Sequence, residues 1–403
     1  MKNINKYYFL IYLILGFSFS NCKEEIDIEN FVGFESALVV EARITNEFKY
    51  HEINLSSSKQ FDIDDFPAVS DATVRIETDN HVIYDYHETG PGKYISNQEF
   101  KAESNRKYQL LIDTNNGESY ISNPTELTNI TQIDELSVAR ETNSYGTEGV
   151  AIKVHSFDDS GKSRYYKYEY EETYKIIAPY WTRLKMILDD FRVPQKVLKT
   201  VNKQICYKTD SSIHIVQYET TGLQEDKVAN FTARFISKDN PVVSHRYSIL
   251  IKQYVQSLEA FSYFKTLNEL AGSGNLFSQN QPGFLNGNIK SNLDSSKKVI
   301  GFFEVSSVSK KRIYFNYLDY FPNENLPPYF IDCEMFPPNS SIEIGPPTDL
   351  EAIIQSDNWL YYIDNYDYPD TINESIGPYF FVRLGCGDCT GIGNLEIPEF
   401  WEE

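Results

Sequence analysis

Apolar and polar residues alternate in short stretches along the first third of the chain. The clearest stretch is ATVRIET at 72–78, which is followed by Asp79-Asn80 and later by Gly90-Pro91-Gly92. Alternation with a period of two residues is typical of a strand with one buried face, and Gly, Pro, Asn and Asp mark turns. The pattern predicts strands at 37–44, 52–56, 72–78, 81–86, 93–95, 107–113 and 119–122. Short strands at roughly ten-residue intervals are typical of an immunoglobulin-like β-sandwich, which we place at residues 34–128.

A tyrosine-rich stretch dominates the pattern that follows, which stays mainly β. Residues 162–175 (KSRYYKYEYEETYK) alternate as a strand does. One face of this expected strand carries Tyr166, Tyr168 and Tyr170, and the opposite face carries Lys167, Glu169 and Glu171. We expect the tyrosines to pack against neighbouring strands, as aromatic side chains commonly do in sheets. A ligand surface formed by the same three tyrosines is the alternative.

One later segment has the helical period. Apolar residues recur at steps of three and four between Ile251 and Leu270, and Gly272 follows as a C-cap. The spacing predicts an amphipathic helix, and its broad apolar face is expected to pack on the sheet of its own domain. A strand pair is expected at 298–308 and 311–317, and a short helix at 349–356.

The expected fold class is therefore mainly β. An N-terminal immunoglobulin-like β-sandwich is followed by a larger β-rich domain, residues 129–403, with one amphipathic helix and a disulfide-linked tail.

The first 21 residues have the composition of an export signal. Lys2 and Lys6 precede an apolar run at 7–19, which ends in Ser20-Asn21. A helix needs about 20 apolar residues to span a bilayer, so the shorter run predicts a removed signal peptide rather than an anchor.

Cys22 follows the expected signal peptide directly. The sequence Phe19-Ser20-Asn21-Cys22 resembles a bacterial lipobox, in which the cysteine becomes the first mature residue and carries acyl chains such as palmitate. Several acyl chains attach a protein durably to a lipid membrane, because each buried CH₂ contributes about 0.8 kcal/mol. We expect residues 22–33 to comprise the lipidated Cys22 and a tether. An ordinary secreted protein is the alternative.

The residues after Cys22 predict a location. Lys23-Glu24-Glu25 resembles the export signal with which lipoproteins of Bacteroidota reach the outer face of the outer membrane. The expected localisation is therefore the outer membrane, with the lipid-anchored protein facing the cell surface.

The charge of the chain excludes one class of partner. The 403 residues contain 58 Asp and Glu against 37 Lys and Arg, a formal net charge of −21. Binding to a phosphate backbone depends on Lys and Arg, so we expect no nucleic-acid partner.

Four cysteines remain once Cys22 is lipidated. Cys206, Cys333, Cys386 and Cys389 would lie in an oxidising compartment, where an even number of cysteines favours disulfides. Four cysteines permit three pairings, and the sequence does not choose among them. A four-thiolate zinc site is one alternative, although only Cys386-x-x-Cys389 has zinc-like spacing. A redox-active pair is another, but this glycine-rich motif lacks the expected βαβ context.

No motif for catalysis is present. The six histidines are scattered, no G-x-S-x-G occurs, and no H-E-x-x-H or complete calcium loop is found. Asp62, Asp64 and Asp65 are interpreted as a solvated acidic loop. We therefore expect no catalytic residues, no metal, no cofactor and no enzymatic activity.

Three stretches resemble a known family. They are Cys22 to Ile28 leading into Ala37–Ala42, then Arg246–Tyr254 through Asn286–Ile289 to Gly301–Phe303, and finally Cys386-Gly387-Asp388-Cys389-Thr390 with Pro398-Glu399-Phe400-Trp401. Together they resemble the Bacteroidota lipoproteins called domain of unknown function 4249, which are commonly encoded beside TonB-dependent outer-membrane transporters.

The resemblance implies a membrane-anchored partner of a transporter, and it brings no catalytic residues. The first expectation is a non-enzymatic accessory subunit of a TonB-dependent transporter that helps to capture or pass on a nutrient. A stand-alone surface binding module or adhesin for polysaccharide or peptide is the alternative, and a hydrolase with an unrecognised site is a third hypothesis. Asp370-Thr371-Ile372 also resembles an O-glycosylation acceptor of this bacterial group.

Overall fold

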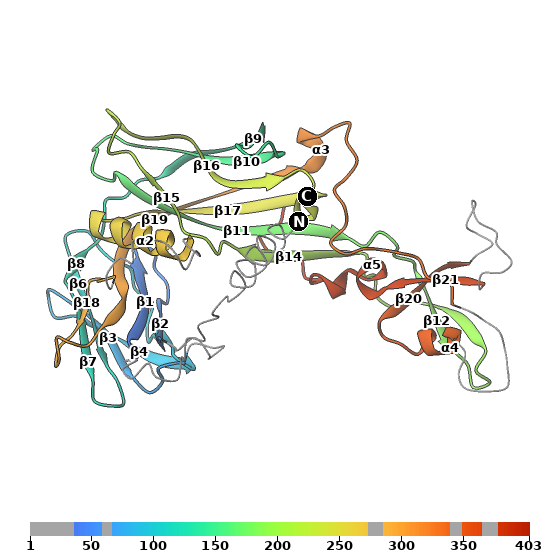
Figure 1. The fold of residues 1–403 in the computed structure, drawn as a ribbon, viewed down its shortest axis with the longest axis horizontal. Coiled ribbons are helices and arrows are strands. Elements are labelled where there is room, and N and C mark those ends of the chain that lie inside the picture. Colours follow the sequence, from blue (N-terminus) through green and yellow to red (C-terminus); the bar gives the residue numbers. More distant parts are fainter. Residues whose placement is uncertain (1–35, 59–66, 273–284, 339–348, 365–377) are drawn as a thin grey trace, which may run out of the picture.

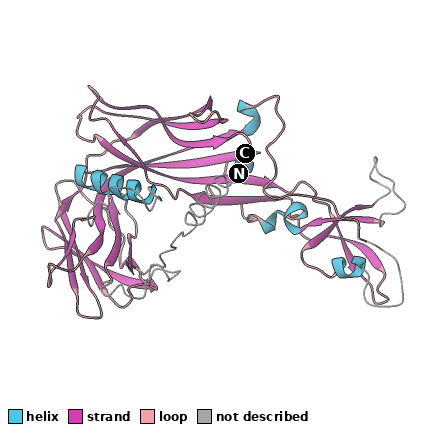
Figure 2. Cartoon of the chain, viewed as in Figure 1, coloured by secondary structure: helices cyan, strands magenta, loops and turns pink. Residues whose placement is uncertain are grey.

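Strands dominate the structure and helices are few (Figure 2), which confirms the mainly β fold class. The structure is a computed structural model, and it describes residues 36–58, 67–272, 285–338, 349–364 and 378–403. No helix in these ranges is long and apolar enough to cross a bilayer.

One sheet of 14 strands forms the body of the molecule (Figure 1). Its strands follow the order β14-β11-β17-β19-β1-β2-β5-β4-β3-β6-β7-β18, with β15 beside β11 and β8 beside β6. Their bounds are β1 Leu38–Thr45, β2 Glu52–Ser57, β3 Thr73–Thr78, β4 Ile83–Gly90, β5 Lys93–Ser96, β6 Lys107–Asp113, β7 Ser119–Ser122, β8 Thr125–Glu126, β11 Tyr165–Ile177, β14 Ile205–Ser211, β15 Val216–Glu219, β17 Arg246–Val255, β18 Ile289–Ser291 and β19 Val299–Asn316.

The strands expected in the N-terminal third are all present as β1 to β7. Their burial alternates as the sequence predicts, for example in β3, where Val74 and Ile76 are buried between half-exposed neighbours. An immunoglobulin-like sandwich is not confirmed, because these strands are hydrogen-bonded in one continuous series instead of two facing sheets. Their core also includes Ile289 and Phe303 from β18 and β19, far along the chain.

β19 is a single strand of 18 residues, where the sequence predicts two strands paired with each other. Its first half runs parallel to β1, with Leu38 opposite Val299, and its second half runs antiparallel to β17, with Val255 opposite Ser307. The expected strand pair is therefore wrong. Each half pairs with a strand from another part of the chain, so no turn forms within the segment.

The second core lies between the β11-β17-β19 region and a three-stranded sheet in the order β16-β10-β9. These strands are β9 Ile133–Thr142, β10 Glu148–Asp158 and β16 Asp226–Ser237, and a 3₁₀ turn, η2, spans Pro241–Val243. Apolar side chains from both sheets, such as Val154 and Ile249, form one buried cluster. A four-residue helix, α3 (Tyr317–Tyr320), follows β19.

The helix expected between Ile251 and Leu270 begins later than the spacing predicts. α2 spans Leu258–Gly272, whereas Ile251 to Val255 belong to β17. β17 is hydrogen-bonded to both β11 and β19 and is buried along most of its length. The apolar residues of this buried strand happen to continue the three- and four-residue spacing of the helix, so the spacing alone places the helix start too early. Ser257 supplies a real helix start, because its Oγ accepts a hydrogen bond from the Ala260 amide at 3.1 Å.

A smaller unit stands out from the body as an arm (Figure 1). It contains β12 (Leu184–Leu188), β13 (Pro194–Leu198), α4 (Asp349–Ile354), β20 (Trp359–Asp364) and β21 (Tyr379–Arg383). Its own apolar core includes Met186, Leu350 and Phe381. The short helix expected near residue 349 is confirmed as α4.

Two disulfides fix the base of the arm. Cys206 is bonded to Cys389 and Cys333 to Cys386, so the C-terminal segment is tied to β14 and to the chain before α4. The cysteine pair 386 and 389 flanks the junction of α5 (Leu384–Gly387) with η4 (Cys389–Gly391). The disulfide prediction is confirmed, and these bonds occupy the sulfurs that a zinc site would need.

We expect loss of the Cys206–Cys389 bond to cost more stability than loss of Cys333–Cys386. The sequence separations are 183 and 53 residues, and in the loop-entropy model the longer loop is worth about 1 kcal/mol more within a usual range of about 2–5 kcal/mol. Thermal and urea unfolding of the two double-alanine variants measure the difference. Equal unfolding midpoints for the two variants would contradict this difference.

Candidate functional site

Two glycines allow close approaches of the backbone at β19, one within the strand and one in the loop before β18. A Cβ atom on Gly301, whose φ is +147°, would lie 2.2 Å from the carbonyl oxygen of Val40. A Cβ atom on Gly287 would lie 1.7 Å from the carbonyl oxygen of Gly301. Only glycine fits at such approaches. The parallel register of β1 and β19 that results places Arg43 opposite Glu304.

A cleft of about 680 Å³ lies between the outer face of β1 and β2 and helix α2. Val39 and Ile300 from the strands and Phe264 and Leu267 from α2 give it apolar walls. Polar side chains from β1, β2, β11 and β19 complete the lining. Its size and mixed lining are those of a small-molecule site.

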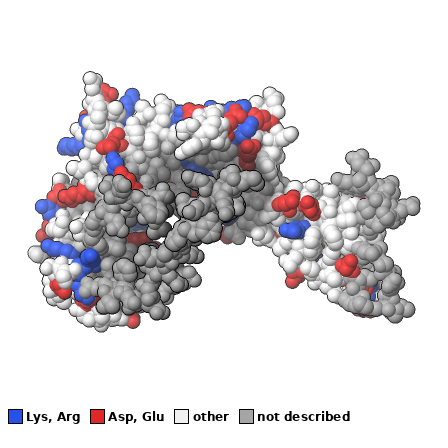
Figure 3. All heavy atoms as spheres, in the orientation of Figure 1, with Lys and Arg blue, Asp and Glu red and all other residues white. Residues whose placement is uncertain are grey.

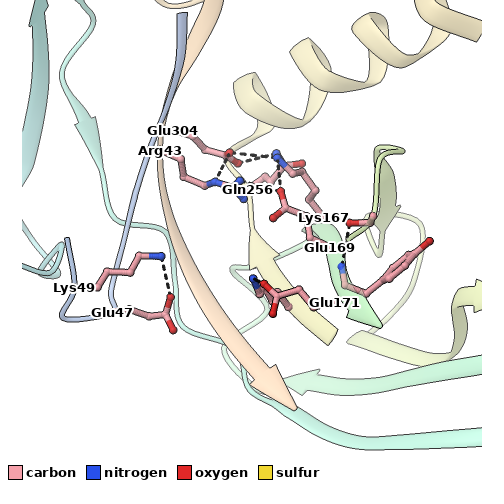
Figure 4. A network of polar contacts seen from close by, with 11 residues as sticks. Arg43, Glu47, Lys49, Lys167, Glu169, Glu171, Gln256 and Glu304 are labelled. Atoms are coloured by element: carbon pink, nitrogen blue, oxygen red, sulfur yellow. Dashed lines mark hydrogen bonds and ion pairs between the residues drawn. The ribbon is translucent and has the colours of Figure 1, made fainter. Parts of the chain in front are cut away.

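A network of ion pairs forms one end of the cleft, where β1, β11 and β19 meet (Figure 4). The Arg43 guanidinium is 2.9 Å from Glu169 and 3.9 Å from Glu304. The Lys167 ammonium is 3.5 Å from Glu169 and 3.6 Å from Glu304. Gln256 donates to Glu304 at 2.7 Å. Two cations and two carboxylates thus neutralise one another.

The network keeps both carboxylates ionised. Burial alone would raise the pKa of Glu304, but Lys167 and Arg43 outweigh it and hold that pKa below its usual value. The pKa of Glu169 is lowered in the same way, against its own burial, chiefly by Arg43. A general acid needs a raised pKa, so this pair is not suited to acid catalysis.

Aromatic rings brace the two cations. The Arg43 guanidinium lies 4.1 Å from the centre of the Tyr254 ring, and the Lys167 ammonium lies 4.3 Å from that of Phe264. These distances are within the range of cation–π attraction. Phe264 belongs to α2, so two interactions position this helix: the contact of Phe264 with Lys167 and the apolar packing of the helix on Phe302.

Three polar side chains in the cleft keep free hydrogen-bonding capacity. Glu41 and Asn54 face each other in the β1–β2 register, and Tyr50 lies nearby with 56% of its surface exposed. None of the three has a side-chain partner among the described residues. By contrast, Lys49 is 3.2 Å from Glu47, and Glu52 is 2.8 Å from Lys93.

His51 lines the cleft but is held neutral. Its Nε2 donates to the Phe100 carbonyl oxygen at 3.0 Å, and Nδ1 is buried without a partner. Burial, helped by Lys49, lowers its pKa from 6.5 to about 4. It therefore carries no charge near neutral pH.

No catalytic constellation is found among the residues that the structure describes. Within the described ranges one hydrogen bond joins a serine side chain to a histidine ring, Ser137 to His155 at 3.0 Å. It lies on the β9–β10 pair, away from the cleft, and none of the described carboxylates is bonded to that histidine. No group of three or more His, Cys, Asp or Glu within the described ranges could hold a metal ion.

The three tyrosines singled out from the sequence do not form a ligand surface. Tyr166 and Tyr168 are fully buried, and their hydroxyls donate to Asp226 at 2.8 Å and to Gln253 at 3.1 Å. Tyr170 packs against the same core. Their sheet face is covered by β16-β10-β9, which corrects the ligand-surface alternative and agrees with the packing interpretation.

Several residues predicted from the sequence lie outside the described ranges. They are the signal peptide, Cys22, the export-signal residues Lys23, Glu24 and Glu25, the acidic residues Asp62, Asp64 and Asp65, and the tripeptide 370–372. The sequence-based expectations for them stay predictions.

The ion-pair network is not predicted from the sequence. The alternation at 162–175 predicts the shared strand face of Lys167 and Glu169 but indicates no role for them. Glu304 stands alone as a charge in the apolar run VIGFFEV, and that isolation was the available signal. Its partner Arg43 could not be found, because parallel pairing of β1 with β19 joins residues far apart in sequence.

Fold and site define a β-rich, disulfide-tied protein with a polar cleft and no recognisable catalytic group in the described residues. The chain belongs to the domain of unknown function 4249 family, whose sequence model matches residues 23–312. The comparison with curated proteins found no match.

A search of solved structures gave a crystal structure of a DUF4785 family protein from Legionella pneumophila. The match has 8% identity and a TM-score of 0.18, and it covers 54% of this chain and 51% of the other. The chain thus spans about half the length of the solved chain it matches.

We expect Glu304→Gln to lower the free energy of unfolding by about 3 kcal/mol, because it leaves Lys167 and Arg43 with one countercharge fewer in a buried position. Urea denaturation measures the loss. The matched control is Glu41→Gln on the same sheet face, which is exposed and unpaired and should change stability by less than about 0.5 kcal/mol. Similar values for both variants would show that the network contributes little.

His51 should make stability depend on pH. The folded protein resists protonation of this ring, so its contribution is present above pH 6.5 and is lost as pH falls through about 4, in total about 3 kcal/mol. His51→Gln can keep the hydrogen bond to Phe100 and has no proton to gain, so its stability should vary less over this window. Urea unfolding curves measured between pH 4 and pH 6.5 give the pH dependence of stability of both proteins. The same dependence in both would refute the role of His51.

Proposed function

We propose that this protein is a non-enzymatic, lipid-anchored accessory subunit of a TonB-dependent outer-membrane transporter, and that its cleft captures a nutrient for the transporter. Membership of the family, the signal peptide expected at residues 1–21 and the lipidation expected at Cys22 support the membrane location. The saturated ion pairs of the cleft favour binding over chemistry, because neither carboxylate has a pKa suited to proton transfer.

The observation that carries the proposal is the apolar tip of the arm. Between β12 and β13, Phe191 is 87% exposed and Val193 49% exposed, and Ile187 near the end of β12 is 38% exposed. Large exposed apolar side chains grouped on a projection are typical of a contact with a partner.

The tip is held in one shape before any contact is made. The Asp189 carboxylate accepts hydrogen bonds from the amides of Phe191 at 2.9 Å and Val193 at 2.8 Å. Arg192 pairs with Glu351 of α4, and Lys196 pairs with Asp364 of β20, which join the hairpin to the rest of the arm. A preformed anchor loses little entropy on binding, which favours a protein partner.

The charges around the tip are of both signs. Asp189 and Asp190 directly precede Phe191, and Arg192 directly follows it. A transporter surface can offer an apolar pocket with charges of both signs around it.

A stand-alone binding module is the second candidate. It is favoured by the fact that the cleft is built within one chain and needs no partner residue for its walls.

We expect a photoreactive p-benzoylphenylalanine at position 191 to crosslink the protein to a TonB-dependent transporter in intact cells. Phe191 reaches solvent at the arm tip, so the reactive group would lie at the proposed contact. The adduct is identified by its mass and by transporter peptides in mass spectrometry.

The matched control places the same residue at Tyr145, which is 92% exposed in the turn between β9 and β10 of the body. It should give no transporter adduct. A Cys22→Ala variant, which cannot be acylated, should lose the adduct with its membrane attachment. Absence of any transporter adduct at position 191 in the anchored protein would favour the stand-alone module.

A further inference from the structure

We infer that the cleft beside α2 binds a short peptide through its free amino terminus. This inference rests on the proposed capture function and names the class of nutrient.

The charge balance of the cleft leaves one carboxylate free. Arg43 and Lys167 are neutralised by Glu169 and Glu304, and each of the other charged lining residues has its own ion pair. Glu41 is exposed and has no partner among the described residues. The whole chain has a formal charge of −21, so its field also attracts cations. A ligand with one positive group is therefore preferred.

The position of Glu41 suits an amino terminus. In the antiparallel register of β1 and β2 it stands directly opposite Asn54, so the two side chains are neighbours on one face. A carboxylate can accept from an ammonium group, while the adjacent amide can both donate to and accept from the first peptide unit. The spacing of one cross-strand pair matches these two successive groups of a peptide.

The walls suit an apolar side chain. Val39 and Ile300 flank Glu41 along the strands, and Phe264 and Leu267 of α2 face the same cleft.

A carbohydrate is disfavoured because the large rings of the cleft are already covered. Arg43 lies over Tyr254, and Tyr263 packs at 5.3 Å from Phe264 and 5.5 Å from Phe302. Tyr254 and Tyr263 are 5% and 6% exposed, which leaves little ring face for stacking a sugar. Tyr50 alone among the cleft tyrosines is open to solvent.

The experiment is a calorimetric titration of the full detergent-solubilised protein with tri-leucine, N-acetyl-tri-leucine and maltotriose. Tri-leucine should bind, and acetylation of its amine should weaken binding about tenfold or more, since a charge-assisted hydrogen bond is lost. Affinity for tri-leucine should also fall as pH rises through about 8, where an α-amino group loses its proton.

Variants locate the contact. Glu41→Gln should weaken tri-leucine about tenfold and leave N-acetyl-tri-leucine unchanged, because only the ammonium contact is removed. The matched control is Glu135→Gln, an exposed glutamate on β9 outside the cleft, which should bind as the unchanged protein does. Unfolding midpoints of both variants confirm that they are folded.

Equal binding of the free and acetylated peptides, binding of maltotriose alone, or no binding of any probe would overturn the inference. These results are independent of the crosslinking at position 191. Failure of the peptide titration with a transporter adduct present leaves the accessory role standing, whereas peptide binding without an adduct leaves the cleft assignment standing.

Discussion

The continuity of β19 is the constraint on which the rest of the structure depends. One strand pairs in parallel with β1 along its first half and antiparallel with β17 along its second half, so two groups of strands share a single backbone. Their relative position is then set by the two hydrogen-bonded ladders that β19 forms rather than by a flexible linker. β1 and β2 form one wall of the cleft, and α2, the helix that follows β17, forms another. Because β19 pairs with both β1 and β17, it positions these two walls relative to each other.

Buried charge at the junction makes that geometry specific. Glu304 is buried in β19 and can remain ionised only if Lys167 of β11 and Arg43 of β1 approach it together. Such a network is costly if any member is displaced, so it favours one arrangement of the three strands over others with similar apolar burial. Glu41, on the same face of β1, takes no part in this network and is exposed.

The arm is stabilised differently from the body. Its core is small, and few apolar side chains hold it together. Two disulfides and the ion pairs of Arg192 and Lys196 add cross-links to this small core. For the transporter contact proposed above, a preformed projection with an exposed phenylalanine would bind at low entropic cost. Figure 3 shows this unit set apart from the body, whose surface carries most of the visible charge on that face.

The sequence by itself determined what depends on local pattern. Two-residue alternation defined β1 to β7 and both faces of β11, and cysteine number implied disulfides without their pairing. Where two patterns compete, local reasoning failed: Ile251 to Val255 have helical spacing yet form a strand, because β11 and β19 pair with it on both sides and the strand is buried along most of its length. Only the tertiary structure decided the pairing of β1 with β19, the meeting of Arg43 with Glu304, the cleft and the cysteine partners. Each of these joins residues far apart in the chain, and nothing in a local run of residues records which distant segment will supply its hydrogen bonds, its countercharge or its sulfur.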